Sequence, residues 1–144
     1  MDAIKLLPKV DLHLHLDGCV KPETILEWAA AEGIALPAAD KAGLLPYMQA
    51  DEGCSSLIEY LDKFAFVLPF LQTEEALERC AYEVVEQAAE DRCIYVEVRF
   101  APLLHAERGL SAGAAIDAVI RGFRAGEAKF GVKARVIAIC MRHH

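Results

Sequence analysis

The chain has 144 residues, of which 55% are hydrophobic, so it is large enough for one domain with a sizeable core and is not a disordered segment. Its formal net charge of -7 argues against a nucleic-acid polymer as the main partner, because an acidic chain repels phosphate backbones. No run approaches the roughly 18 apolar residues of a membrane helix, so no membrane partner is expected.

The first predicted element is a strand at residues 10–16, which Gly18 ends. Its side chains alternate strictly, with Val10, Leu12, Leu14 and Leu16 on one side and Asp11, His13, His15 and Asp17 on the other. This period of two is typical of a strand, and it predicts that the apolar side is buried.

Helices are predicted in the segment that follows this strand. One is expected to begin at residues 21–23, where proline suits the first turn, and to end at Gly33. Prolines and glycines between residues 34 and 54 indicate short helices and turns. Ser56 and Glu59 match a capping box, and the helix behind them is expected to run to about residue 70.

In the second half of the chain, predicted helices alternate with predicted strands. A helix opens at residues 73–75, a strand is expected at 93–102, a helix follows Ser111, and a third strand covers 132–140. Apolar strands joined by helices favour parallel β-α-β units whose sheet is covered on both faces.

The cysteines and the first residues bear on the cellular compartment. Five cysteines, an odd number, stand in apolar surroundings without a CxxC pair, namely Cys19, Cys54, Cys80, Cys93 and Cys140. This usage favours reduced thiols over a disulfide framework. The first residues lack the long apolar core of a signal peptide. We therefore expect a cytoplasmic protein.

The main chemical signal is the histidine pair of the first strand. His13 and His15 are two residues apart, so their imidazoles project to the same face. Two imidazoles on one face can ligate a single Zn²⁺-like ion if further ligands come from elsewhere. The alternative is a pair of hydrogen-bonded histidines in the core or at its rim. The row of polar residues that ends at Asp17 suits a cleft or a barrel end better than a dry core, and this favours the metal site.

Four segments resemble the adenosine deaminases, a branch of the metal-dependent amidohydrolase superfamily. They are LPKVDLHLHLDGCVKPETILEWAAAEGIALP at residues 7–37, SLIEYLDKF at 56–64, YVEVRFAPLLH at 95–105 and ICMRHH at 139–144. The match runs in order through essentially the whole chain. The combination of HxHLDG with KPET is its most specific part.

The resemblance implies an α/β fold, a (β/α)₈ TIM-type barrel with its site at the carboxyl ends of the strands. This chain would supply about the first three strands with extra N-terminal helices, so that residues 1–144 form the N-terminal part of a single deaminase domain. His13 and His15 would be two ligands of one Zn²⁺ per complete chain, with a histidine and an aspartate from later strands. Metal-activated water would deaminate a small-molecule purine nucleoside, adenosine or 2'-deoxyadenosine, giving inosine (or its deoxy counterpart) and ammonia.

The resemblance also implies substrate contacts. His15 and Asp17 would touch the substrate, with Asp17 holding a ribose hydroxyl. The alternative for Asp17 is a turn aspartate beside Gly18. An apolar lid over the pocket would consist of Leu57, Tyr60, Leu61 and Phe64, which could equally be ordinary core packing of an amphipathic helix. Tyr60 stands where the family often has Phe.

No catalytic residue is expected within this chain. The resemblance implies that the glutamate that protonates the purine ring, and the histidine and aspartate that orient the nucleophile, lie beyond His144. Glu97 and Arg99 are expected to form a structural network of the barrel interior, with direct contact to the site as the alternative. His105, His143 and His144 are not expected to be metal ligands. The PCxxC motif of the other deaminase chemistry is absent.

Three interpretations stay open, because a barrel of this type needs about 250 residues. The first is the N-terminal portion of an adenosine deaminase. The second is a sibling amidohydrolase that deaminates adenine, a 6-aminopurine nucleotide or a modified nucleoside. Asp17 disfavours free adenine, and the lack of a basic cluster disfavours a phosphorylated substrate. The third is a non-catalytic truncated fragment that self-associates through exposed strand edges.

Overall fold

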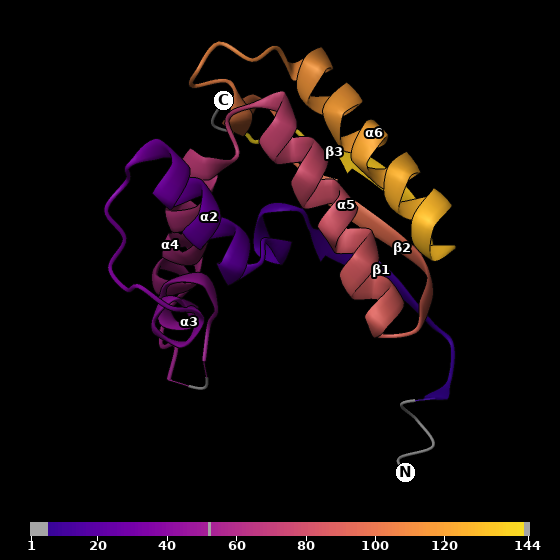
Figure 1. Cartoon of the computed structure of the whole chain (residues 1–144), viewed down its shortest axis with the longest axis horizontal. Coiled ribbons are helices and arrows are strands. Elements are labelled where there is room, and N and C mark those ends of the chain that lie inside the picture. The colour runs from indigo at the N-terminus through magenta and orange to yellow at the C-terminus, as the bar shows by residue number, and fades with distance from the viewer. Residues whose placement is uncertain (1–5, 52, 143–144) are drawn as a thin grey trace.

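The computed structural model describes residues 6–51 and 53–142. Three strands, β1 (Lys9–His15), β2 (Cys93–Phe100) and β3 (Lys133–Ala138), form one sheet in the order β1-β2-β3. Both pairings are parallel, as the sequence predicts. Figure 1 shows the helices α5 (Glu74–Glu90) and α6 (Ala112–Phe130) side by side over the sheet. The element order is that of consecutive β-α-β units, the repeating unit of a (β/α) barrel.

The core of the molecule lies between this helix pair and the sheet. Its buried members include Leu77, Cys80, Val84, Val85, Val96, Val98, Val119 and Phe123. Two glycines of α6 allow the helices to approach closely. A Cβ atom at Gly122 would lie 2.2 Å from the Glu78 carbonyl oxygen, and one at Gly126 would lie 2.7 Å from Cβ of Val85. The two helices therefore form one rigid layer over β2.

A separate group of helices precedes α5. α2 (Pro22–Glu32) begins with proline and ends at Gly33, as the sequence predicts, and the φ of 68° at Gly33 is a left-handed cap. α3 (Lys41–Met48) and α4 (Leu57–Val67) follow, and the short 3₁₀ helix η2 (Leu68–Phe70) continues α4. Figure 1 shows α2, α3 and α4 gathered on one side of the molecule.

The start of α4 differs slightly from the predicted capping box. The Ser56 hydroxyl accepts a hydrogen bond from the Glu59 backbone N–H, at 3.2 Å, as a capping box requires. The Glu59 carboxylate, however, accepts from the backbone N–H of Ser55, at 3.0 Å, one residue earlier than predicted. Both bonds satisfy donors at the helix entry, so the predicted boundary of α4 is confirmed.

The strict alternation predicted for the first strand is wrong in its first half. Val10 and Leu12 are 54% and 55% exposed, so they are not part of the core. Asp11 lines the same small cavity beneath α5 as Leu14 does, although the alternation puts them on opposite faces. The physical reason is an irregular register between Asp11 and Leu14. The Asp11 carboxylate also accepts a hydrogen bond from the His13 N–H, at 2.9 Å, which is a local turn contact.

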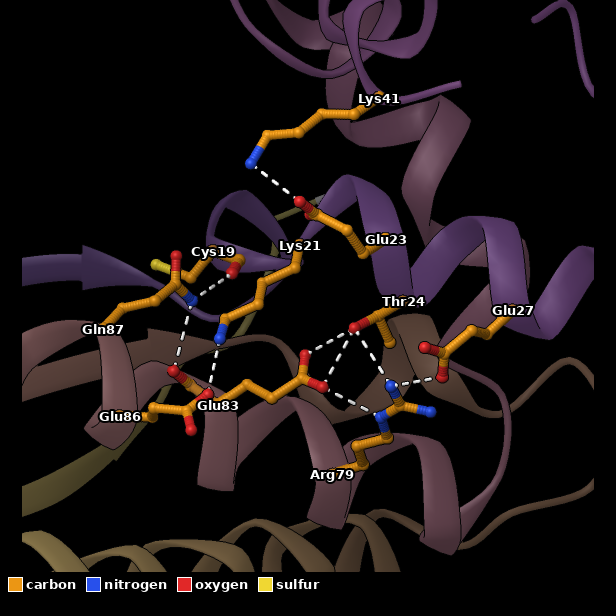
Figure 2. Close-up of polar contacts among 10 residues, drawn as sticks. All are labelled: Cys19, Lys21, Glu23, Thr24, Glu27, Lys41, Arg79, Glu83, Glu86 and Gln87. Carbon is orange, nitrogen blue, oxygen red and sulfur yellow. Dashed lines mark hydrogen bonds and ion pairs between the residues drawn. The ribbon is translucent and has the colours of Figure 1, made fainter. Parts of the chain in front are cut away.

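A polar network fastens α2 to α5, and Figure 2 shows its contacts. The buried Thr24 hydroxyl donates to the Glu83 carboxylate, at 2.7 Å, and Arg79 Nε donates to the same carboxylate, at 2.8 Å. Arg79 also forms an ion pair with Glu27, at 2.6 Å. Gln87 of α5 donates to the Cys19 carbonyl, at 2.9 Å, so the turn after β1 is held by the same helix. The network thus fixes the segment that carries the histidine pair.

Two further observations concern membrane-spanning helices and the cysteines. Within residues 6–51 and 53–142, no helix has the length and hydrophobicity to cross a bilayer. All five cysteines are free thiols, and Cys80 is fully buried, its thiol donating to the Leu16 carbonyl at 3.4 Å.

Candidate active site

The two histidines of β1 lie next to each other on one face of the sheet. Their rings are stacked, with centroids 5.5 Å apart and an angle of 25° between the planes. The Phe64 ring of α4 meets His15 edge-on, with centroids 6.0 Å apart. The carboxyl end of β1, which carries the histidine pair, therefore lies against α4.

The pair fits part of a zinc site. Zn–N bonds are about 2.1 Å long, and rings this close can each turn one nitrogen to a common ion. In the described part of the chain, no group of three or more His, Cys, Asp or Glu side chains could hold a metal. His13 and His15 can therefore supply two of the four ligands of a tetrahedral site, and the others must come from elsewhere.

A cavity of about 200 Å³ adjoins the pair at the carboxyl ends of the strands. His15 and Asp17 form its polar side. On one side the apolar lining comes from α4 and η2, with Tyr60, Leu61, Phe64 and Leu68. On the other side it comes from the end of β2 and the segments after β2 and β3, with Phe100, Ala101, Leu104, Ile139 and Met141. Parallel strands bring their carboxyl ends to one edge of a sheet, which is why residues far apart in sequence meet here.

The structure brings together most of the predicted site residues. His15, Asp17, Tyr60, Leu61 and Phe64 all line the cavity, and His13 stacks on His15 beside it. Leu57 does not line it, because it stands in the first turn of α4 with its side chain 71% exposed.

Sequence reasoning missed the lining residues on the side of the cavity that faces away from α4. Phe100 ends the second strand, Ala101 and Leu104 follow it, and all three line the cavity together with His15. The signal was the position of the FAPLL segment at the end of a predicted parallel strand, since such ends converge on one site.

Asp17 stands in an apolar setting that opposes its charge. Burial raises the pKa of its carboxyl group, while His15, His105 and the backbone N–H groups of Asp17 and Gly18 lower that pKa. The Oδ1 atom is buried and has no hydrogen-bond partner among the described residues. This carboxylate therefore has acceptor capacity left inside the cavity.

Glu97, Arg99 and His105 do not line the cavity. Glu97 accepts a hydrogen bond from the Tyr95 hydroxyl, at 3.0 Å, and Arg99 donates to the Leu12 carbonyl, at 2.8 Å. His105 is 1% exposed, and its Nδ1 lies 2.8 Å from the Leu71 carbonyl oxygen. His143 and His144 lie outside the described residues.

Comparison with known proteins settles the family. Residues 8–144 match the family model described as adenosine deaminase. The chain belongs to the adenosine deaminase family. An adenosine deaminase of Enterococcus faecalis is 46% identical over 140 residues, which are 97% of this chain but only 41% of that protein. The chain thus spans about two fifths of the length of this deaminase.

Solved structures of longer deaminases share the fold. Adenine deaminase from Arthrobacter aurescens superposes with a TM-score of 0.75 at 30% identity, covering 91% of this chain and 39% of that one. An amidohydrolase from Burkholderia ambifaria with bound Zn has a TM-score of 0.74 at 26% identity, and the match covers 92% of this chain and 35% of that one. Arabidopsis ADAL complexed with GMP has a TM-score of 0.77 at 26% identity, and the match covers 100% of this chain and 44% of that one. The three strands and their helices therefore have the fold of part of a TIM-type barrel, as the sequence predicts.

Proposed function

We propose that the site serves the hydrolytic deamination of adenosine to inosine and ammonia, and of 2'-deoxyadenosine in the same way, within a complete barrel. The observation that carries the proposal is that His15 and Asp17 line one cavity while His13 stacks on His15. This arrangement joins two potential metal ligands and one substrate-binding carboxylate in a small-molecule pocket.

In this proposal His13 and His15 hold one Zn²⁺ through a ring nitrogen each. The ion, when bound, lowers the pKa of a water molecule so that hydroxide is available near neutral pH. Both imidazoles act as ligands in their neutral form. The Phe64 ring covers one side of His15 and excludes bulk water from that side. The family resemblance, the bound Zn of the Burkholderia ambifaria amidohydrolase and the shared face of the two rings support this assignment.

The remaining lining would bind the nucleoside. The Asp17 carboxylate, which lines the cavity, accepts a hydrogen bond from a ribose hydroxyl. Tyr60, Leu61 and Phe64 lie against the flat purine and keep water from it. The cavity is predominantly apolar with few polar groups, which is typical of pockets for small aromatic ligands.

Residues 1–144 are, in this proposal, the N-terminal part of a single barrel domain. The third histidine, the aspartate ligand and the glutamate that protonates the purine are expected on strands that follow β3 in the longer relatives. The share of the Enterococcus faecalis deaminase that the chain matches supports this assignment.

A second candidate is a sibling activity on adenine or on a 6-aminopurine nucleotide. It is favoured by the similarity to adenine deaminase of Arthrobacter aurescens and to Arabidopsis ADAL, which was crystallised with GMP. Asp17 distinguishes the candidates, because a carboxylate in the cavity binds a sugar hydroxyl but repels a phosphate. Among the described residues that line the cavity, the charged or ionisable ones are His15, Asp17 and Tyr60, without Lys or Arg, which favours the nucleoside.

A chimera tests the proposed function. Residues 1–144 replace the matching segment of the Enterococcus faecalis deaminase, and ammonia release is measured with adenosine, 2'-deoxyadenosine, adenine and AMP. We expect turnover of the two nucleosides, which is lost in His13→Ala and kept in Asp11→Asn, a control on the helix side of β1. A folded, zinc-loaded chimera that favours adenine or AMP would contradict the nucleoside assignment. One that deaminates none of the four would contradict the proposed activity.

A further inference from the structure

Two buried acceptor atoms stand close to the cavity without a hydrogen-bond donor. They are Oδ1 of Asp17 and Nε2 of His105, and neither has a partner in the described part of the chain. The His105 ring contacts the Phe100 ring, with centroids 5.6 Å apart, and Phe100 lines the cavity together with Asp17. The two residues also act on each other electrostatically, since each lies among the charges that shift the pKa of the other.

The protonation of His105 follows from its surroundings. Nδ1 lies 2.8 Å from the Leu71 carbonyl oxygen, which can only accept, so Nδ1 carries the hydrogen. Burial lowers the pKa of His105, and the ring is therefore neutral near neutral pH. Its Nε2 is then an unprotonated acceptor inside the protein.

The segment that carries His105 is held firmly. His105 ends the 3₁₀ helix η3 (Pro102–His105), which follows β2. The buried Gln72 side chain donates to the Leu104 carbonyl, at 3.0 Å, and accepts from the Glu107 N–H, also at 3.0 Å. With the Leu71 contact, these bonds fix the direction in which Nε2 points.

Two acceptors cannot bond to each other, so each needs a donor hydrogen from a third group. A substrate hydroxyl has only one hydrogen and can serve only one of them. We propose that a buried water molecule donates one hydrogen to Asp17 Oδ1 and the other to His105 Nε2, so that His105 is a positioning residue for the Asp17 carboxylate. Buried waters commonly satisfy such groups in this way.

The bridge would have a consequence for ligand binding. With Oδ1 engaged by the water, the carboxylate is held in one orientation, and its second oxygen faces the cavity for a donor of the ligand. This last step rests on the proposed function, whereas the bridge itself does not. The experiments below use neither metal nor turnover, so they decide on the bridge independently of the deaminase assignment.

A double-mutant cycle in the metal-free chimera, where the strand edges are paired, tests the bridge. The effect of Asp17→Ala on the unfolding equilibrium constant is measured by urea unfolding in wild type, His105→Phe and His105→Gln. Phe removes both ring nitrogens, while Gln keeps one N–H donor and one acceptor. We expect the effect of Asp17→Ala to differ by about tenfold or more between wild type and His105→Phe, and to be largely kept in His105→Gln. Ser111→Ala, which removes the cap of α6, is the control and should combine additively with Asp17→Ala.

Additive effects of Asp17→Ala in all three His105 backgrounds would overturn the proposal. If His105→Phe does not fold, ¹⁵N spectra of the His105 ring decide the question instead. They should show a protonated Nδ1 and an unprotonated, hydrogen-bonded Nε2, and Asp17→Ala should shift the Nε2 signal and leave Nδ1 in place. A protonated Nε2, or an Nε2 signal that Asp17→Ala does not move, would equally overturn it.

Discussion

Phe64 meets the imidazole of His15 edge-on, with ring centroids 6.0 Å apart, and the same ring lies over Gly18. A Cβ atom at Gly18 would stand 3.4 Å from Cε1 of Phe64. The helix α4 therefore rests directly on the turn that follows the histidine pair. A single aromatic side chain thus links the predicted lid to the predicted metal ligands.

Phe64→Ala is expected to weaken adenosine binding more than tenfold, because it removes a large apolar contact surface from the cavity wall. Calorimetric titration of the protein with adenosine measures the effect. Leu57→Ala is the matched control on the same helix, since Leu57 is 71% exposed and does not line the cavity. Equal losses in the two variants would show that α4 acts only through overall stability.

His13→Ala and His15→Ala are each expected to reduce bound zinc strongly, because each removes one of the two imidazoles that share a face. Elemental analysis of the purified chimera, together with Zn²⁺ titration, gives the metal content per chain. His105→Gln serves as a histidine control outside the pair. Unchanged zinc content in both β1 variants would refute the ligand assignment.

Asp17→Ala is expected to raise KM for adenosine in the chimera, with a smaller effect on kcat. The rise should correspond to about 1–3 kcal/mol of binding free energy, which is lost with the charge-assisted hydrogen bond. Steady-state kinetics with adenosine and 2'-deoxyadenosine measure the change. If both nucleosides are deaminated as before, Asp17 is only a turn residue.

Residues 1–144 on their own are expected to release no ammonia from adenosine above background and to self-associate. Two imidazoles leave a zinc ion short of ligands, and the outer edges of β1 and β3 have no neighbouring strand in the described sheet. Light scattering and an ammonia assay on the same sample test both statements. A monodisperse monomer with zinc-dependent activity would contradict both.

Gly122→Ala is expected to destabilise the protein by about 1–3 kcal/mol or more, because its Cβ would lie 2.2 Å from the Glu78 carbonyl oxygen. Gly113→Ala in the same helix is the control, since nothing lies within 4 Å of a Cβ placed there. The control should be neutral or stabilising by up to about 1 kcal/mol, as alanine favours the helix over glycine. Urea unfolding compares the two variants.

The sequence predicted the parts of the fold that local chemistry decides. Pro22 and Gly33 bound α2 because one suits a first turn and the other adopts a left-handed cap. The alternation of β1 was predicted wrongly because the register irregularity after Asp11 depends on the pairing with β2, which no local pattern encodes.

The same division holds for the candidate site. The stacking of His13 and His15 could be anticipated from their spacing, because alternate residues of a strand share a face. The apolar stripe of α4 was equally compatible with ordinary core packing and with a lid over the pocket, because amphipathicity does not show what a helix packs against. The exposure of Leu57 and the edge-on contact of Phe64 with His15 emerge only from the packing of α4 on the end of β1.

The close approach of α5 and α6 at Gly122 also sets how the molecule opens. Amide hydrogens in this helix pair and in β2 are buried in the main core, so we expect them to exchange with solvent only when the whole domain unfolds. α3 and the first turns of α4 hold few buried side chains, and the Lys41–Glu23 ion pair that ties α3 to α2 is exposed. Their amides should exchange through a local opening that requires less free energy than global unfolding. Such an opening would admit a ligand to the cavity while the α5–α6 pair and the sheet stay folded.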